Sequence, residues 1–351
     1  MKRRDFLKQT AATAGTAAVL GSTGPYILGA DDKAGSKAPV VGWGEHTYEC
    51  NHNWCKLPAG WIWQTTHGVC VDGEGLVYIK QQGHDKKPAV DTVAVFEPNG
   101  KFVRSFGKAI HPGGHGIDLR KEGSEEFLYL CDTAHGEVLK TTLNGDVVWK
   151  LSFPPEADVY SKTKPYRPTN LAFAPDGGFY VGDGYGQNYI HQYDKDQKWV
   201  RTWGGFGSEP GKMKTPHGIW LDNRPGREVS LVVADRANAR LQYFTLEGKH
   251  IKMVEGLLFP ASFDIRGNVL LVPDLHARIT LMDIDNKPIV HLGYDPNWTE
   301  EVKKFVIRGN EKLWKPGKFV HPHDACFDRD GNIFVTEWVQ TGRVSLLKKV
   351  G

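Results

Sequence analysis

One short phrase recurs along the chain and constrains its fold more than any other feature. Its fullest copy runs from Thr215 to Phe244 and reads TPHGIWLDNRPGREVSLVVADRANARLQYF. An apolar run follows His217, a charged turn comes next, and two further β-rich runs begin at Leu231 and Leu241. Short apolar runs separated by polar turns are typical of strands in an antiparallel meander.

Six copies of this phrase start at equivalent positions, and four of them start with histidine. The six head residues are His67, His115, Asn170, His217, Ser262 and His323. Each copy has room for four short strands in roughly forty residues, which is the length of a β-propeller blade. The sequence therefore predicts an all-β fold, a six-bladed β-propeller that forms a single domain over residues 31–351.

The turns between copies and the N-terminal stretch predict how the ring is built and closed. Trp203-Gly204-Gly205-Phe206-Gly207, followed by Pro210-Gly211, is typical of the turns of NHL repeats. Val40-Val41-Gly42-Trp43-Gly44 resembles the outer strand that ends at Gly204, yet it precedes the first copy. We expect it to complete the last blade, so that the ring has no free strand edge. Residues 294–312 form a longer insert, in which we predict a short helix capped at Thr299.

The first thirty residues have the features of an export signal. Lys2-Arg3-Arg4 precedes a weakly apolar stretch from Ala11 to Leu20, which resembles a twin-arginine signal over residues 1–30. A poor Sec signal or a basic tail is the alternative. The stretch is too short and too polar to span a membrane. We therefore expect an exported protein, periplasmic or extracellular.

The formal net charge of +3 comes entirely from this segment, which holds four basic residues and one acid. The rest of the chain is close to neutral. Charge therefore offers no basis for binding nucleic acid or an anionic membrane.

Five cysteines, an odd number, leave at least one thiol unpaired in a monomer. Cys50 and Cys55 flank a short loop and are the candidate disulfide; with His52 they could instead bind a metal. Cys70 and Cys326 each lie three residues after a head histidine, and we expect both to be free, buried thiols.

The head residues of the copies predict a metal site. In a propeller the innermost strands line the central channel, so equivalent positions converge near one end of it. Neutral imidazoles from different strands suit Zn²⁺, and three protein ligands leave one position open for catalysis. The alternative is a set of hydrogen-bonded polar residues in a wet channel.

Several motifs resemble the lyase domain of peptidylglycine α-amidating enzymes, over most of the chain after residue 30 and most strongly from Asp183 to Phe244. They are Gly114-His115-Gly116, Asp183-Gly184-Tyr185, Pro216-His217-Gly218, Ala234-Asp235-Arg236 and Pro322-His323-Asp324. That family cleaves peptides ending in α-hydroxyglycine to a peptide amide and glyoxylate.

The resemblance implies a role for each matching residue. His115, His217 and His323 would hold zinc. Tyr185 would be the base at the metal, and Arg236 would bind the substrate carboxylate. A structural calcium ion would use Asp324 and the backbone carbonyls of Val69 and Ile117.

The chain also departs from the family's pattern. The family has a second arginine in blade one, where this chain reads Lys80-Gln81-Gln82-Gly83-His84; Lys80 is the candidate substitute, as a point charge. His67 is an additional channel histidine and a further candidate ligand. His321 stands near the metal where a methionine is expected, and Gly186 follows Tyr185 where the family has a cysteine.

These observations favour a zinc-dependent lyase, acting as a monomer on a small-molecule or peptide substrate. Two alternatives remain open. One is a non-catalytic NHL propeller that binds protein or glycan ligands on its rim, with Tyr185 a rim aromatic and Arg236 paired with Asp235 or a neighbouring blade. The other is a calcium-dependent, lactonase-like hydrolase.

Overall fold

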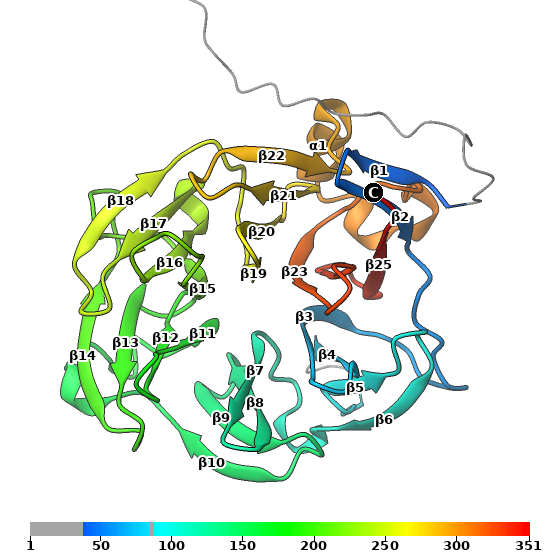
Figure 1. The fold of residues 1–351 in the computed structure, drawn as a ribbon. Coiled ribbons are helices and arrows are strands. Elements are labelled where there is room, and N and C mark those ends of the chain that lie inside the picture. The colour runs from blue at the N-terminus through cyan, green and yellow to red at the C-terminus, as the bar shows by residue number, and fades with distance from the viewer. Residues whose placement is uncertain (1–37, 85–87) are drawn as a thin grey trace, which may run out of the picture.

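The computed structural model describes residues 38–84 and 88–351. Its elements form six antiparallel sheets arranged around a central channel (Figure 1). The strands are β1 (Val40–Trp43), β2 (His46–Asn51), β3 (Thr65–Val71), β4 (Val77–Gln82), β5 (Val93–Phe96), β6 (Phe102–Phe106), β7 (Ile117–Glu122), β8 (Glu125–Asp132), β9 (Glu137–Thr142), β10 (Val147–Leu151), β11 (Asn170–Phe173), β12 (Phe179–Gly182), β13 (Tyr189–Tyr193), β14 (Trp199–Gly204), β15 (Pro216–Asp222), β16 (Ser230–Asp235), β17 (Arg240–Phe244), β18 (His250–Val254), β19 (Asp264–Arg266), β20 (Val269–Asp274), β21 (Arg278–Met282), β22 (Pro288–Leu292), β23 (Pro322–Phe327), β24 (Ile333–Glu337) and β25 (Arg343–Lys349).

Each blade is a meander whose first strand lies next to the channel. The innermost strands are β3, β7, β11, β15, β19 and β23 (Figure 1). Because each blade packs between two others, its second strand is buried on both faces. This explains why β16 reads as a continuous apolar run rather than as an alternating pattern. The prediction of an all-β, six-bladed propeller is confirmed.

The two ends of the chain meet in blade six, as predicted, but with one strand more than expected. The order of this sheet is β1-β2-β25-β24-β23. Strand β2 takes the fourth place, where Cys50 lies opposite Leu347, and β1, the predicted closing strand, adds a fifth. Tyr48 and Cys50 of β2 are buried in a cluster shared with blade five. This closure covers the edge of β25.

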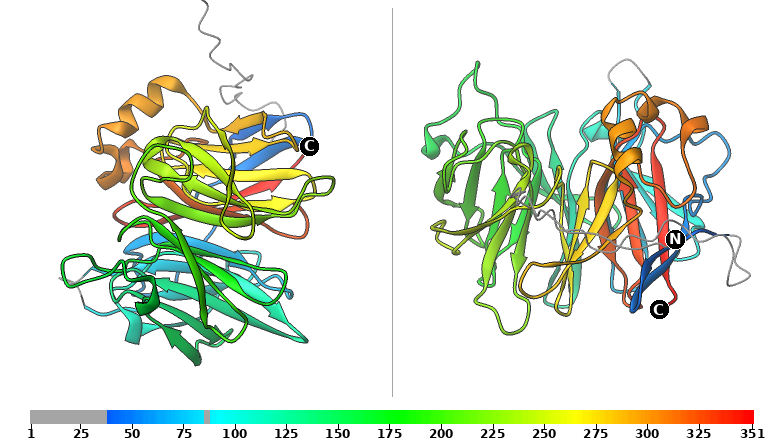
Figure 2. Two further views of the ribbon diagram at one scale, coloured as in Figure 1. Left: turned by 90° about the vertical axis from the view of Figure 1, so that its left-hand side faces the viewer. Right: turned by 90° about the horizontal axis from the view of Figure 1, so that it is seen from above.

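The insert between blades five and six packs on loops at one end of the ring (Figure 2). It contains α1 (Pro296–Lys303) and the 3₁₀ turns η4 (Ile307–Gly309) and η5 (Glu311–Leu313). The predicted cap was wrong: Asp295 accepts the backbone N–H bonds of the first turn, and Thr299 is buried within the helix. Pro296 at the first helical position suits this start.

All five cysteines are free, so the predicted Cys50–Cys55 disulfide is wrong. Cys50 belongs to the core shared by blades five and six, whereas Cys55 packs against the core between blades six and one. Proximity in sequence therefore does not bring the two thiols together.

The signal predicted for residues 1–30 lies outside the described residues and stays a prediction. Within residues 38–84 and 88–351, no helix is long and apolar enough to cross a membrane.

Candidate metal centre

All six head residues of the repeat line a single cavity at one end of the channel, as predicted. The cavity measures about 10 Å³, which is close to the space that one water molecule needs. Its walls also include Gly68, Gly116, Ala261 and Asp324. A space of this size suits one small ion.

Three of the head residues, His115, His217 and His323, form a compact group. Their candidate ligand atoms all lie within 4.8 Å of one another. Their ring centroids are 4.5 to 4.8 Å apart, and all three side chains are buried. One such ligand from each of three alternate blades matches the usual ligand set of a catalytic zinc site.

Hydrogen bonds set which ring nitrogen of each histidine faces the cavity. The Nδ1 atoms lie 2.5 Å, 2.6 Å and 3.0 Å from backbone carbonyl oxygens, which can only accept, so each Nδ1 carries the proton. The pairs are His115 with Thr169, His217 with Ala261, and His323 with His67. Each Nε2 therefore presents a lone pair, and those of His115 and His323 have no partner in the described part of the chain. A histidine that binds a metal needs a free lone pair on one ring nitrogen and a hydrogen bond at the other that fixes the ring. His115 and His323 meet both requirements.

The glycines that follow His115 and His217 make this geometry possible for two of the three rings. A Cβ atom on Gly116 would lie 2.8 Å from the oxygen of Thr169, and one on Gly218 would lie 2.6 Å from that of Ala261. Those are the carbonyls that hold the histidine rings. The His-Gly pair therefore lets the next blade's backbone approach closely enough to accept the Nδ1–H bond.

Burial keeps the three rings neutral. It lowers the pKa of His115, His217 and His323 well below the usual value, and the positive charge of Arg236 adds to the effect. Neutral imidazole is the form that binds a metal ion.

Tyr185 and Arg236 stand together beside this group. The Tyr185 hydroxyl lies 3.2 Å from Nε2 of His217 and accepts a 3.0 Å hydrogen bond from Nη1 of Arg236. The guanidinium also lies between the rings of Tyr185 and Phe259, about 5 Å from each. The structure thus brings the predicted base, the predicted carboxylate-binding residue and the histidine group together.

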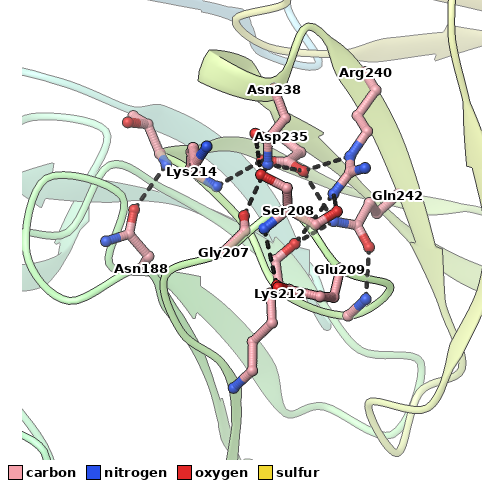
Figure 3. Close-up of polar contacts among 12 residues, drawn as sticks. Asn188, Gly207, Ser208, Glu209, Lys212, Lys214, Asp235, Asn238, Arg240 and Gln242 are labelled. Carbon is pink, nitrogen blue, oxygen red and sulfur yellow. Dashed lines mark hydrogen bonds and ion pairs between the residues drawn. The ribbon is translucent and has the colours of Figure 1, made fainter.

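Arg236 does not pair with the preceding Asp235. That carboxylate instead accepts hydrogen bonds from Arg240, Asn238 and Gln242, and from the backbone of Lys214 (Figure 3). The network fixes the loop between β16 and β17 and leaves the Arg236 guanidinium free of any ion pair with the described residues. Arg236 is therefore presented to the site instead of being neutralised within its own loop.

Similar carboxylates end the second strand in five blades, a feature that we did not predict. In blade three, Asp183 accepts hydrogen bonds from the backbone N–H groups of Arg167 and Gln187, and so holds the loop that carries Tyr185. The signal in the sequence was an acidic residue at the end of five of the six second apolar runs. The five residues are Asp132, Asp183, Asp235, Asp274 and Glu337.

Comparison with known proteins places this geometry in context. No protein-family model matches the chain. It is 29% identical over 260 residues to peptidyl-glycine alpha-amidating monooxygenase A of Xenopus laevis, covering 70% of this chain and 26% of that protein. It is 28% identical over 269 residues to peptidyl-alpha-hydroxyglycine alpha-amidating lyase 1 of Drosophila melanogaster, covering 70% and 47%. The chain thus spans less than half the length of either relative.

This chain is similar in sequence to the amidating enzymes. Solved structures share its fold at much lower identity. Virginiamycin B lyase from Staphylococcus aureus superposes with a TM-score of 0.55 at 12% identity, covering 86% of this chain and 100% of that one. A putative gluconolactonase superposes with a TM-score of 0.52 at 14% identity, covering 84% and 96%. These two matches concern the fold alone.

His67 lies next to the three-histidine group but outside it. Its Nδ1 bonds to the oxygen of Thr65 at 3.1 Å, and its ring centroid lies 4.5 Å from that of His323. Burial lowers its pKa to about 3. The ring is therefore a neutral wall of the cavity.

Lys80 is fully buried on β4, and its ammonium group has no hydrogen-bond partner among the described residues. Burial lowers its pKa to about 8, against the opposing charge of Asp132. Its charge also acts on His67 and His115. The positive charge of Lys80 therefore acts on the histidines from the second strand of blade one.

Asp324 links blade six to blade one at the predicted calcium position. Its carboxylate accepts hydrogen bonds from the N–H groups of Val69 and Ala325.

With Asp118 and Asp264, Asp324 lines a second cavity, of about 160 Å³, farther along the channel. Burial raises the pKa of Asp324 and of Asp264 to about 7, and one oxygen of Asp118 has no partner in the described chain. Ile117, whose carbonyl was predicted as another calcium ligand, begins the neighbouring inner strand β7. None of these three carboxylates, two buried and one half-buried, forms an ion pair with the described residues, and such a group is the environment a hard cation favours.

A cavity of about 750 Å³ lies elsewhere, between β2, η5 and the turn after β24. It holds Cys50 and His52, whose Sγ and Nε2 atoms are 3.4 Å apart. Cys55, the third residue of that alternative metal group, also lines it, whereas none of the residues predicted for the zinc, calcium or substrate sites does.

Proposed function

We propose that this chain is an exported, zinc-dependent lyase that cleaves the C–N bond of a carbinolamide, releasing an amide and glyoxylate. One arrangement carries the proposal: three neutral histidines with lone pairs on one cavity, beside the hydrogen-bonded pair Tyr185–Arg236. The sequence similarity to amidating enzymes supports this reaction class. The twin-arginine pattern of residues 1–30 supports export.

The donor set fits zinc. His115, His217 and His323 offer three neutral imidazole nitrogens. The Nε2 atoms of His115 and His323 have no hydrogen-bond partner among the described residues, and a bound ion would satisfy their lone pairs. Zinc bound there would supply Lewis acidity, which lowers the pKa of a hydroxyl group that it contacts.

The protein's own groups can carry the proton and the charge. Arg236 would take the substrate carboxylate in its guanidinium fork. The phenolate of Tyr185 would accept the proton of the substrate hydroxyl as the C=O bond of glyoxylate forms. The C–N bond then breaks, its electrons stay on nitrogen, and the tyrosine returns the proton to that nitrogen. The amide and glyoxylate together contain all the atoms of the substrate, so no oxidant or reductant is required.

We also propose a structural calcium ion at Asp324, with the carbonyls of Val69 and Ile117 as further ligands. The buried carboxylates around the 160 Å³ cavity support it. The ion would tie together the inner strands β3, β7 and β23, which belong to neighbouring blades.

Metal content and product release test the proposal together. We expect about one zinc ion per chain in the purified protein, and glyoxylate release from α-hydroxyglycine peptides. Both should be lost in the triple variant His115→Ala/His217→Ala/His323→Ala. The control is His250→Ala, on the outer strand of the blade that carries His217. Absence of metal from the folded wild-type protein, or zinc without glyoxylate release, would contradict the lyase assignment and leave a binding propeller.

A further inference from the structure

Arg308, from the insert between blades five and six, is held in a fixed orientation. Its Nε donates a 3.0 Å hydrogen bond to the oxygen of Trp338, and its guanidinium carbon lies 3.5 Å from the centroid of the Trp338 ring. These contacts use one nitrogen and one face of the group. The two terminal NH₂ groups form no hydrogen bond with any described residue. A guanidinium fixed in this way is ready to bind a carboxylate with two parallel bonds.

The position of Arg308 is at the histidine end of the channel. The ring of Trp338 packs 5.7 Å from that of His321, two residues before the candidate ligand His323. The insert itself packs on loops of blades five and six through Ile307 and Val339, at the same end of the ring as the Arg236 loop.

Charge pairing distinguishes Arg236 from the other arginines that the fold buries, and the half-buried Arg308 likewise has no carboxylate partner among the described residues. Arg224, Arg240 and Arg343 each pair with a buried carboxylate, from Asp222, Asp235 and Glu337. Neither Arg236 nor Arg308 forms an ion pair within residues 38–84 and 88–351. Two unpaired guanidinium groups beside neutral histidines leave the mouth of the site positively charged. An anionic ligand would offset the cost of keeping these charges partly out of water.

Backbone strain indicates that this part of the insert is held in shape. Phe305 has a φ of 61°, although it is a bulky residue, and its ring stacks at 5.3 Å on that of His321. The side chain is nevertheless 55% exposed. Strained residues persist only where the surrounding structure enforces them, and they gather at ligand-binding segments.

We propose that Arg308 is a second anion-binding residue of the metal site, and that the substrate carries an acidic group besides the carboxylate that Arg236 takes. This inference rests on the proposed function for the role of Arg236. It specifies the substrate class as acidic: in the peptide case, a peptide with an acidic residue next to the hydroxyglycine.

A matched pair of substrates tests the inference. The rate constant kcat/KM is measured for two α-hydroxyglycine peptides that differ only in having Glu or Gln before the hydroxyglycine. Wild type should favour the Glu peptide by about tenfold or more, the usual worth of a charge-assisted hydrogen bond. Arg308→Gln should bring the ratio close to one, and Arg308→Lys should restore part of it.

Arg329→Gln is the control, because Arg329 is an exposed arginine beyond the far end of β23 and its loss changes the net charge equally. It should retain the wild-type preference. No preference in wild type, or a preference that survives Arg308→Gln, would overturn the proposal.

A binding measurement separates this inference from the lyase assignment. The zinc-loaded protein is titrated with glutarate, a dicarboxylate, and with butyrate, a monocarboxylate, at one ionic strength. Wild type should bind glutarate at least about tenfold more tightly than Arg308→Gln does, and Arg329→Gln should match wild type. If no peptide is cleaved, the lyase assignment fails while this difference still supports the anion site. Equal affinity of wild type and Arg308→Gln, or no binding of glutarate to either, overturns the anion site.

Discussion

The hydroxyl of Tyr185 touches both halves of the candidate site. It contacts the ring of His217 and the guanidinium of Arg236. The side chain is nonetheless 40% exposed, so little of the fold depends on it. This combination allows the chemical role of the residue to be separated from a structural one.

Removal of that hydroxyl should therefore affect the reaction and little else. In Tyr185→Phe we expect kcat for glyoxylate release to fall by about 10² to 10⁴, the usual contribution of a general acid–base group. Zinc content and Tm should stay close to wild type, because the ring and its packing are kept. Tyr189→Phe, at the end of the same loop, is the control. A Tyr185→Phe enzyme with the wild-type rate would exclude Tyr185 as the base.

Single residues of the site differed in how far the sequence could predict them. The repeat placed the histidines at one structural position, and the fold then brings them together. The direction of Lys80 could not be read in this way, because a long side chain on β4 can turn toward the channel or toward the next blade. Arg308 carried no signal at all, since it lies in an insert outside the repeat.

At the level of elements, the loops after the second strands position the site, and buried carboxylates hold these loops. Asp235 in blade four is the clearest case, with hydrogen bonds from four residues (Figure 3). Asp222 lies at the opposite end of the same blade and forms a buried ion pair with Arg224. The two carboxylates are alike in burial but differ in distance from the site.

These two residues allow a matched comparison. Asp235→Ala and Asp222→Ala should each destabilise the protein by about 3–5 kcal/mol, because each leaves a buried arginine unpaired. Only Asp235→Ala should also raise KM, since it releases the loop that presents Arg236. Tm and steady-state kinetics, measured at a temperature where both variants are folded, provide the test. An equal loss of activity in both variants would show that the effect is one of stability alone.

The boundaries of elements were predictable where the repeat applied and unpredictable elsewhere. Every inner strand followed from the recurring phrase. The role of β2 did not, because its sequence gives no sign that it, and not β1, pairs with β25. The helix cap was misplaced because Asp295 and Thr299 are both suitable caps by residue type, and only the packing of Thr299 against the loop of His276 decides between them.

On the scale of the whole molecule, the ring depends on the strand that closes it. Strand β2 covers the edge of β25 and buries Tyr48 and Cys50, whereas β1 lies outermost and contributes Val41. Removal of residues 1–44 should therefore cost about 2 kcal/mol or somewhat more, the loss of one buried Val and one strand. The truncated chain should still fold.

Removal of residues 1–51 should have a much larger effect, because the edge of β25 becomes free and a tyrosine-sized hole opens in the core. We expect this chain to aggregate. Thermal unfolding and size-exclusion chromatography of both truncations test the difference. Similar behaviour of the two would mean that β2 does not hold the ring closed.

The buried carboxylates of the channel link the stability of the whole ring to pH. Burial raises the pKa of Asp264 from 3.8 to about 7 in the folded protein. Between these values the folded state retains a proton that the unfolded state loses. The free energy of unfolding therefore falls as pH rises through this window. The channel histidines act in the opposite sense. Burial lowers their pKa, so the free energy of unfolding falls as pH drops below about 6.5, where the unfolded chain takes up protons that the folded protein does not.

Calcium should reverse the carboxylate effect, because it binds the ionised form. We expect calcium to raise Tm by more at pH 8 than at pH 5.5. In Asp118→Asn, which lacks one of the three channel carboxylates, Tm at pH 8 without calcium should exceed that of wild type, and the gain from calcium should shrink. Asp196→Asn, on an exposed turn, is the control and should follow wild type. If calcium raises Tm equally at both pH values, or if Asp118→Asn responds as wild type does, the three carboxylates do not bind the ion. Their raised pKa values would then belong to an acidic cavity that stays protonated near neutral pH.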